Sequence, residues 1–392
     1  MISISDKTKC CGCSACAQRC PKHCISMLED SEGFLYPVVK IDDCINCGIC
    51  ERVCPIINQG SERVPVRCYA AKGKDEIIVN KSSSAGVFSL LADNIIKRGG
   101  VVFGAKFNQY WEVVHSHTET LDGIDPFRGS KYVQSRIGSS FQEVETYLKQ
   151  GRHVLFTGTP CQIAGLKRFL GKEYENLIAV DVVCHGTPSP IVLRSYLRNV
   201  LGLKPSIEVL SEKEAARITS FSFRDKHLSW EQYCVNIIGL SNAGNQTTLV
   251  NEQYTEDPFM QAFLFNYMLR PSCYNCPARK GKSGSDLLIG DFWGISRIYP
   301  DFYSPKGVSL SLVYSEKGLS LFDDLDLCKM EVSYEDTKGN RNIEFNEIRP
   351  HEREAFFINF SKFGIRAIKW YNWFFKHSTI NRVLRRFTRW FK

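Results

Sequence analysis

The sequence predicts an α/β protein, in which a small α+β N-terminal domain precedes a larger α/β domain with a largely parallel or mixed sheet. Two observations support this prediction. Ten of the 17 cysteines fall within residues 10–54, where one spacing occurs twice. From residue 68 onward, apolar strand patterns alternate with helical patterns, as in βαβ units. The chain has 392 residues, 43% of them hydrophobic, which suffices for two or three domains with a large core.

The repeated spacing is C-x2-C-x2-C-x3-C-P, and its two copies are offset by 34 residues. It is the signature of a ferredoxin-like domain with two [4Fe–4S] clusters, in which the fourth cysteine of each copy binds the other cluster. Proline fits after that cysteine because the first turn of a helix needs no N–H there. The predicted ligands of cluster one are Cys10, Cys13, Cys16 and Cys54. The predicted ligands of cluster two are Cys44, Cys47, Cys50 and Cys20.

Other uses of cysteine explain this pattern less well. Zinc sites pair two C-x2-C units and have no use for a third cysteine followed by x3-C-P, and disulfides do not need the repeat. Cys11 and Cys24 lie outside the register and are not expected to be ligands. No apolar leader precedes Cys10, and no apolar run approaches the roughly 18 residues of a membrane span. We therefore expect a cytoplasmic protein, where thiols stay reduced.

The net charge of +8 comes from the C-terminal end of the chain. Residues 355–392 contain nine Lys or Arg and no Asp or Glu. Without them, 41 basic residues face 42 acidic ones, which is a net charge of −1. The body of the protein is therefore not expected to bind nucleic acid.

The patterns divide the chain into four parts. Residues 1–58 form the two-cluster domain, with a hairpin of the apolar runs ISMLED and FLYPVV between its motifs. Residues 59–67 are polar and turn-rich, as a linker is. The larger domain follows at 68–350, and a basic, aromatic helical tail at 351–392. In the larger domain the predicted helices are 86–100, 139–151, 159–171, 188–202 and 257–269, and the predicted strands are 101–107, 112–118, 152–158, 176–184, 221–226, 233–240, 286–294 and 308–315.

Two turns of the larger domain, LFTGTPC and VVCHGTPSP, each follow a buried strand and open a helix. Thr159 and Thr187 are the predicted caps, and Pro160 and Pro188 are predicted at the first helical positions. If the strands are parallel, both turns lie at the carboxyl edge of the sheet, where open α/β sheets bind ligands. Helix N-termini at that edge suit a phosphate or another anion.

Four cysteines in turn-like segments are candidates for a third [4Fe–4S] cluster: Cys161, Cys184, Cys273 and Cys276. A helix N-terminus is expected to lower the pKa of Cys161, which favours ligation. Two alternatives stay open, namely that the first two are small buried core residues and that the C-x2-C unit binds zinc. The isolated Cys68, Cys234 and Cys328 are predicted core residues, and His115 and His117 are predicted surface residues.

Three further segments are candidates for cofactor contacts. SSSAGVF (82–88) could hold an anion, RGSKYVQS (128–135) could grip a phosphate and stack on a ring, and GDFWG (290–294) suits a planar ring. Each has a plain alternative, which is an N-cap with spare serines, a solvated turn and a packed corner, respectively. No G-x-G-x-x-G motif follows a strand, so the dinucleotide fingerprint is absent from the sequence.

The tail mixes aromatic residues with Arg and Lys at helical spacing, as a helix lying on an anionic membrane does. This interpretation makes the protein peripheral at the inner face of a membrane. The alternative is a C-terminal helix that docks on the body or on a partner protein. The apolar stripe of the helix is predicted at Trp370, Trp373, Phe374, Leu384, Phe387 and Trp390.

Seven motifs in order resemble the beta-subunit family of coenzyme F420 hydrogenases and dehydrogenases. They are SSSAGVFSLLA, RGSKYVQS, VLFTGTPCQIAGLK, VDVVCHGTPSP, FRDK, LRPSCYNC and SDLLIGDFWGI, between about Cys68 and about Gly294. Members of this family bind FAD and iron–sulfur clusters, and they pass electrons between one-electron centres and a deazaflavin or another two-electron acceptor. A flavin is the expected converter between these two kinds of chemistry. Ala85 departs from the family pattern, because many members have glycine at this position.

The resemblance implies the third cluster and an FAD pocket, with His185 and the GDFWG turn near the pocket. It implies an iron–sulfur flavoprotein oxidoreductase with coenzyme F420 as a candidate substrate, and a ferredoxin or another redox protein as partner. Two alternatives are a non-catalytic electron-transfer subunit of a larger complex and an accessory redox protein of surface polysaccharide biosynthesis. The implied FAD-pocket residues are Ser83, Ser84, Gly86, Gly129, Ser130, Lys131, Thr157, Gly158 and Thr159.

Overall fold

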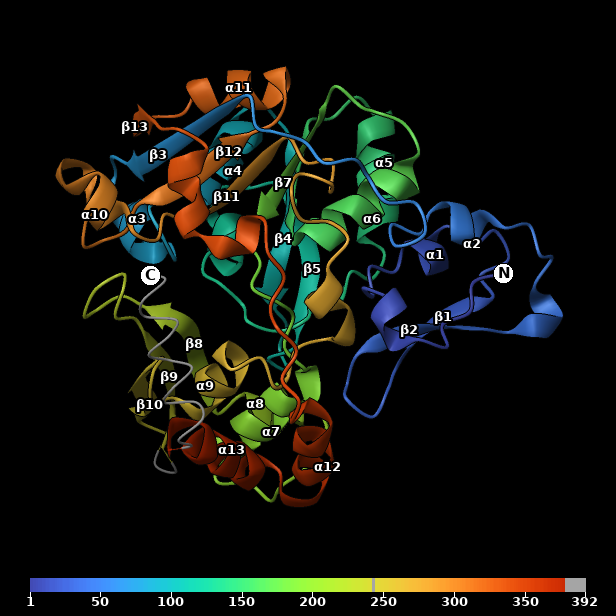
Figure 1. Cartoon of the computed structure of the whole chain (residues 1–392), viewed down its shortest axis with the longest axis vertical. Coiled ribbons are helices and arrows are strands. Elements are labelled where there is room, and N and C mark those ends of the chain that lie inside the picture. The colour runs from blue at the N-terminus through green and yellow to red at the C-terminus, as the bar shows by residue number, and fades with distance from the viewer. Residues whose placement is uncertain (242–243, 378–392) are drawn as a thin grey trace.

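The computed structural model describes residues 1–241 and 244–377 (Figure 1). A small N-terminal module, residues 1–58, lies at one side of a large body made by the rest of the described chain (Figure 1). Within these described ranges, no helix has both the length and the apolar character needed to cross a membrane.

The N-terminal module is built from one hairpin and two helices of one turn each. Strands β1 (Ile25–Glu29) and β2 (Leu35–Val39) pair antiparallel, which confirms the predicted hairpin. The helices α1 (Ala15–Gln18) and α2 (Ile49–Arg52) are offset by 34 residues, like the cysteine motifs. The sequence repeat is therefore also a structural repeat.

The body contains an eight-stranded sheet with the strand order β13-β3-β12-β11-β7-β6-β4-β5. The four central strands run parallel, and the outer ones pair antiparallel, so the sheet is mixed. Strand β5 follows β4 after a short turn, which leaves no room for the crossover that a parallel pair requires. The strands are β3 (Arg67–Gly73), β4 (Val101–Phe107), β5 (Val113–Thr118), β6 (Val154–Gly158), β7 (Leu177–Val182), β11 (Leu287–Asp291), β12 (Ser309–Val313) and β13 (Leu327–Glu331).

Both faces of this sheet are buried, because side chains alternate between two hydrophobic clusters. In β6, Val154 and Phe156 pack against α5 (Ser140–Lys149) and α6 (Pro160–Leu170), whereas Leu155 packs against α4 (Val87–Lys97) and α11 (Glu316–Asp323) on the opposite face. Near-continuous apolar runs such as HVLF have this explanation, and they are typical of strands with two covered faces.

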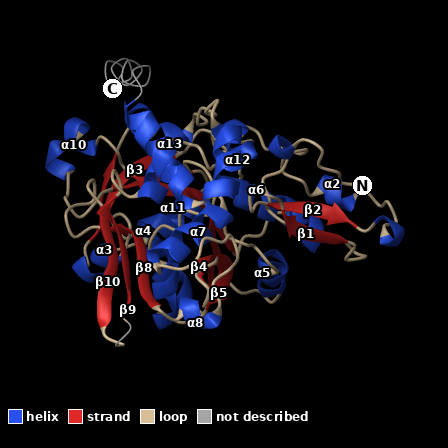
Figure 2. Cartoon of the chain, turned by 90° about the horizontal axis from the view of Figure 1, so that it is seen from below, coloured by secondary structure: helices blue, strands red, loops and turns tan. Residues whose placement is uncertain are grey.

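A second, three-stranded sheet lies beside a group of helices (Figure 2). Strands β8 (Ile218–Asp225), β9 (Cys234–Leu240) and β10 (Gln246–Gln253) are antiparallel, and β10 was not predicted because its sequence QTTLVNEQ is mostly polar and exposed. The helices that share its core are α7 (Pro190–Val200), α9 (Pro258–Leu264), α12 (Arg353–Phe363) and α13 (Ile365–His377). The short helices elsewhere are α3 (Glu76–Lys81), α8 (Glu212–Ala215) and α10 (Ile295–Ile298).

One of the two predicted helix starts is right and the other is wrong. Helix α6 has Thr159 as its N-cap, in a capping box with Gln162, and Pro160 follows at the first helical position. Helix α7 instead begins after Ser189, with Pro190 first. Thr187 and Pro188 lie outside the helix because the backbone of Thr187 bonds to another segment. The Thr187 N–H donates to the Cys273 sulfur, and the Thr187 carbonyl accepts from the Arg270 N–H.

Candidate metal centres and cofactor site

The two cysteine loops of the module share one backbone conformation. Gly12 and Ser14 in the first loop, and Asn46 and Gly48 in the second, have positive φ angles of 70°, 64°, 51° and 71°. These positions are again 34 residues apart. Left-handed residues between successive cysteines turn the chain sharply enough for several thiols to face one point. The repeat thus carries the loop geometry as well as the ligands.

The predicted ligands of cluster two surround one pocket. It is lined by Cys20, Cys44, Cys47 and Cys50, together with Met1 and Ile45. The backbone N–H of Ile2 donates to the Cys50 sulfur at 3.3 Å, a bond that favours a thiolate there. The chemistry of this set fits a four-iron cluster, since four sulfurs face a common space and one backbone donor already serves a sulfur. Cys24 lies beside this set, with its sulfur 3.4 Å from that of Cys20.

The predicted ligands of cluster one lie on the side of the module that faces the body. Burial, and after it the neighbouring charges of Cys10 and Cys54, raise the pKa of Cys16 to about 12. Cys13 is buried against helix α6, and a Cβ atom on Gly165 would lie 2.7 Å from the Cys13 Cβ atom. A bound metal cation reverses this pKa shift, because ligands bind it as thiolates. This set fits a cluster, and α6 forms part of its wall.

The four cysteines proposed for a third cluster come together in the body. Cys161 stands in the first turn of α6, and Cys184 follows β7. Cys273 lies in the 3-10 helix η4 (Pro271–Asn275), and Cys276 is the C-cap of η4. Burial comes first among the effects that raise the pKa of Cys184, and the next is the charge of Cys273, followed further down by those of Cys161 and Cys276. Three turns that are distant in sequence therefore bring four thiols into mutual electrostatic range.

The expected low pKa of Cys161 is wrong. A hydrogen bond with the Cys11 thiol, and then burial, raise the pKa of Cys161 well above its ordinary value. Cys11 also meets Cys13, so its thiol stands between a residue of the cluster-one set and a residue of the third set. The sequence pattern placed Cys11 outside both ligand sets and provided no sign of this position.

The remaining cysteine and histidine predictions are only partly right. Cys68 and Cys234 are buried as predicted, but Cys328 is exposed on β13, an edge strand of the large sheet. His115 is buried, with its ring nitrogens 2.9 Å from the Ser135 hydroxyl and 3.0 Å from the Thr157 carbonyl oxygen. Among the described residues, no group of three or more His, Cys, Asp or Glu side chains is arranged around a single metal ion. This finding concerns single ions, because the cysteine sulfurs around a four-iron cluster lie further apart than those around one ion.

Six of the FAD-pocket candidates meet at the N-terminus of α4. The Ser130 N–H donates to the Ser83 hydroxyl at 2.7 Å, which joins the SSSAG loop to the RGSKY loop. Gly86, with a φ of 89°, is the N-cap and offers no capping side chain to the helix. Gly129 has open space where a Cβ would stand. The loops thus leave the first N–H groups of an eleven-residue helix without a side-chain cap, as an anion site does.

Two lysines that flank these loops donate to backbone carbonyls. The Lys131 ammonium donates to the carbonyls of Pro126 and Arg128 at 2.8 and 2.7 Å, and burial lowers its pKa to about 7. The Lys226 ammonium donates to three carbonyls, including that of Ser84 at 2.9 Å, and burial lowers its pKa to about 8. Desolvated cations that face backbone oxygens favour a bound anion. Lys226 belongs to the FRDK motif, which had suggested no role for it.

The other three FAD candidates are two threonines and a glycine that contact other parts of the fold. The Thr157 hydroxyl donates to the Phe103 carbonyl at 3.0 Å, and Thr159 caps α6. Gly158 lies against Gln162. His185 stands between Asn266 at 2.7 Å and Glu347 at 3.2 Å, and Glu347 lies outside every motif recognised in the sequence.

The GDFWG turn is a packed corner. Asp291 forms an ion pair with the buried Arg224 and accepts from the Trp230 indole N–H at 2.9 Å. The rings of Trp230 and Trp293 stack at 5.0 Å. Because both carboxylate oxygens of Asp291 are already bonded, the turn itself presents rigid aromatic surface rather than a free acid.

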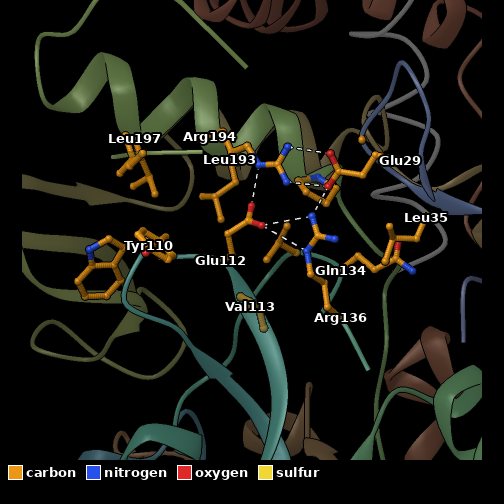
Figure 3. A pocket seen from close by; sticks show the side chains of 15 residues that line it. Glu29, Leu35, Tyr110, Glu112, Val113, Gln134, Arg136, Leu193, Arg194 and Leu197 are labelled. Atoms are coloured by element: carbon orange, nitrogen blue, oxygen red, sulfur yellow. Dashed lines mark hydrogen bonds and ion pairs between the residues drawn. The ribbon is translucent and has the colours of Figure 1, made fainter. Parts of the chain in front are cut away.

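Figure 3 shows a pocket at the contact between the module and the body, which the sequence did not reveal. Arg194 on α7 donates to Glu29 of β1 at 2.7 and 2.9 Å and to Glu112 at 2.6 Å. Arg136 pairs with the same two glutamates, so two cations and two anions alternate in a closed ring (Figure 3). The charges balance one another, and the ring fixes the hairpin to the body.

The comparisons with known proteins match both parts of the chain. Residues 9–56 match the 4Fe-4S dicluster domain, and residues 151–338 match the family that comprises the C-terminal part of the coenzyme F420 hydrogenase/dehydrogenase beta subunit. A curated relative is the F subunit of the F(420)H(2) dehydrogenase of Methanosarcina mazei, which is 26% identical over 183 residues. This match covers 44% of the chain and 51% of that protein, so the chain spans about half the length of this relative.

A solved structure that the chain matches is the F420-reducing [NiFe] hydrogenase complex from Methanosarcina barkeri, in a xenon derivative. The TM-score is 0.45 at 16% sequence identity. The alignment covers 78% of the chain and 95% of the chain it matches.

Proposed function

We propose that the chain is an iron–sulfur flavoprotein oxidoreductase of the coenzyme F420 hydrogenase/dehydrogenase beta-subunit family, because residues 151–338 match the C-terminal part of that subunit and residues 9–56 match a 4Fe-4S dicluster domain. It passes electrons between [4Fe–4S] clusters and a two-electron donor or acceptor through FAD. Coenzyme F420 is the first substrate to test, because the name of the curated relative contains its reduced form.

One observation carries this proposal: the Cys11 thiol, which belongs to neither ligand set, meets both Cys13 of the module and Cys161 of the body. A separate electron carrier would not need its cysteine loop buried against a second group of four thiols. The α4 loops add a place whose donors fit the phosphates of FAD. When bound, FAD exchanges a hydride with a substrate and single electrons with clusters.

The residues of the chain have distinct roles in this proposal. The eight module cysteines hold two clusters, and Cys161, Cys184, Cys273 and Cys276 hold the third. The α4 N–H groups, Ser83 and Ser130 bind phosphate oxygens, and Lys131 supplies a positive charge beside them. The stacked Trp230 and Trp293 keep water from the neighbouring corner.

Anaerobic reconstitution tests the proposal. We expect about twelve irons per chain from three four-iron clusters, and one bound FAD. About eight irons would remove the third cluster, and a protein that cannot retain FAD would be an electron-transfer subunit instead. Reduction assays with coenzyme F420, nicotinamides and ferredoxin then identify the substrate and the partner.

The described part of the tail favours contact with an anionic membrane surface as a second role. Helix α13 buries Ile368 and Tyr371 in the core, while Trp370 and Trp373 are 56% and 59% exposed. The other stripe residues, Phe374, Leu384, Phe387 and Trp390, have side chains outside the described residues. We expect the full chain to sediment with anionic lipid vesicles, and the double variant Trp370→Ser, Trp373→Ser to do so less. Equal sedimentation of both proteins would leave these tryptophans without a membrane role.

A further inference from the structure

Arg270 is a buried cation at the boundary between the module and the body. Its side chain is 1% exposed, although it carries a full charge. The guanidinium donates to the Cys10 carbonyl at 2.8 Å, to the Leu35 carbonyl at 2.8 Å and to the Gln134 side-chain oxygen at 2.9 Å. It also lies over the ring of Tyr36 at 4.3 Å. Four of its neighbours are therefore fixed by one planar group, which lysine could not replace.

The same guanidinium reaches both sides of the boundary. A Cβ on Gly12, between Cys10 and Cys13, would lie 2.8 Å from its Nη1 atom, so the first cysteine loop is in close contact with it. On the body side, its charge acts on the Cys161 and Cys273 thiols, and its carbonyl accepts from the Cys273 N–H at 2.9 Å. Within the described part of the chain, no carboxylate forms an ion pair with Arg270, so these dipoles and sulfurs surround its positive charge.

The two cysteine sets of the module differ in their distance from this boundary. Helix α1, which carries Cys16, packs on α5 and α6 of the body. In the other set, Cys47 is exposed and the pocket is lined only by residues of the module. Figure 1 shows α2 on the outer side of α1, towards the chain N-terminus.

We propose that the set Cys10, Cys13, Cys16 and Cys54 is the inner redox site of the module, that the set Cys20, Cys44, Cys47 and Cys50 is the outer one, and that Arg270 is the positioning residue that joins the inner site to the body. The inference rests on the proposed function. Electrons cross the boundary at Cys11 and Arg270. A cluster held by Cys10, Cys13, Cys16 and Cys54 would exchange single electrons with one held by Cys161, Cys184, Cys273 and Cys276, a transfer that breaks no bond and moves no proton.

The charge of Arg270 has a second effect on the inner site. A cluster that accepts an electron gains a negative charge, and a buried cation beside it favours that reduced form. Arg270 therefore raises the reduction potential of the inner site, whereas the outer site, whose pocket Arg270 does not line, should respond less.

The test is an EPR-monitored redox titration of reconstituted variants. Arg270→Gln should shift the midpoint potential of the inner site to a more negative value, and Arg270→Lys, which keeps the charge, should shift it less. Arg194→Gln is the matched control, because Arg194 is also buried and also binds the module through Glu29, away from the cysteines. It should shift neither module site. The variants Cys16→Ser and Cys50→Ser assign the two signals.

A further variant keeps the test decisive if Arg270→Gln does not fold. Gln134→Glu places a carboxylate 2.9 Å from the same guanidinium, and it should lower the inner potential with Arg270 in place. The inference is overturned if the midpoint potential of the inner site does not change, or if it shifts no more than in Arg194→Gln. It is also overturned if only the outer site shifts. An iron count near eight would instead remove the third cluster from the proposed function, while the potential of the inner site could still be measured.

Discussion

At the scale of single residues, burial decides the charge state of several groups that the sequence pattern could only name. His115 alternates with His117 along β5, and both were predicted at the surface. Only His115 is buried, and burial lowers its pKa to about 4, so that its ring is neutral at pH 7. Burial likewise lowers the pKa of Lys131, whereas a hydrogen bond with the Cys11 thiol, and after it burial, raise the pKa of Cys161. Both shifts disfavour the charged form of the group.

The neutral His115 should make folding sensitive to acid. Its pKa is lower in the folded than in the unfolded state, so the unfolded chain binds its proton first, and stability falls as the pH drops from about 6.5 through about 4. The total loss from this residue is on the order of 3 kcal/mol. Thermal unfolding of His115→Gln between pH 7 and 4 should therefore depend less on pH than that of the parent protein. His117→Gln serves as control, and an equal slope in both variants would contradict the prediction.

The proposed FAD site should lose affinity as the pH rises through about 7, because Lys131 then loses the positive charge that the proposal places beside the phosphates. Fluorescence titration of the reconstituted protein between pH 6 and 9 measures this effect, and we expect a fall in affinity of roughly tenfold. In Lys131→Arg the guanidinium stays charged, so the step near pH 7 should be lost while a smaller one near pH 8 from Lys226 persists. If the affinity for FAD falls equally near pH 7 in the parent protein and in Lys131→Arg, Lys131 does not face the cofactor.

At the scale of elements, helix α6 links the two parts of the protein. Its first turn carries Cys161, its apolar face covers the sheet, and Gly165 lies against Cys13 of the module. The sequence motif GTPC already indicated a capped helix start. It could not indicate that the next turn of this helix forms the wall of a cysteine loop from the other end of the chain.

Replacing Gly165 should therefore disturb the cluster-one loop. Alanine is the better helix former by about 1 kcal/mol, but its Cβ would stand 2.7 Å from the Cys13 Cβ and 2.9 Å from the sulfur. We expect Gly165→Ala to lower the free energy of unfolding by about 2 kcal/mol and to reduce iron retention. Chemical denaturation and iron analysis measure these effects, with Arg168→Ala on the exposed side of α6 as the control. Full iron content in Gly165→Ala would show that the cysteine loop around Cys13 can shift to accept the added methyl group.

The C-terminal helices belong to the core, which fixes where a truncation can begin. Deleting residues 366–392 removes Ile368 and Tyr371, which are almost fully buried against α7 and α9. We expect this deletion to lower the melting temperature by about 10 °C or more, since several buried apolar side chains are lost. Deleting only residues 378–392 keeps both side chains and is the comparison for this deletion. A similar loss for both deletions would mean that the last fifteen residues also stabilise the fold.

At the scale of the whole molecule, three buried arginines of the body hold the module. Arg194 binds Glu29, Arg270 binds the carbonyls of Cys10 and Leu35, and Arg353 on α12 binds Glu32 at 2.5 and 3.0 Å. All but one of these partners belong to the β1–β2 hairpin or its turn. The hairpin therefore does more than support the cysteine loops, because it is the part by which the module docks.

Removing two of these arginines should loosen the module without touching the cysteines. In Arg194→Gln combined with Arg353→Gln, Glu29 and Glu32 lose their strongest partners. We expect each substitution to lower the free energy that holds the module on the body by about 2 kcal/mol. Limited proteolysis should then cut the linker near residues 59–66 several times faster than in the parent protein. A control pair on the surface is Lys74→Gln with Arg98→Gln, whose ion pairs are exposed. Equal cleavage of all three proteins would contradict the docking role.

Local patterns in the sequence determined the elements that depend on neighbouring residues. The cysteine spacing of each loop, the hairpin between the loops and the capped start of α6 are each written in a short stretch of the chain. The same is true of six strands of the large sheet, whereas its strands β3 and β13 were not predicted. The strand β10 was missed because its side chains face solvent and leave no apolar pattern. The start of α7 was misplaced because Thr187 bonds to Cys273, which is remote in sequence.

Only the tertiary structure decided which of these local pieces meet. Thiols at 11, 161, 184, 273 and 276 approach one another, and Arg270 lies between the first cysteine loop and the body, through contacts between segments that are distant in sequence. A sequence pattern records the spacing that one turn requires, but it does not record which turn faces which. For this protein, the residues alone identified an iron–sulfur protein, and the packing of the module on the body brought its cysteine sets against those of the rest of the chain.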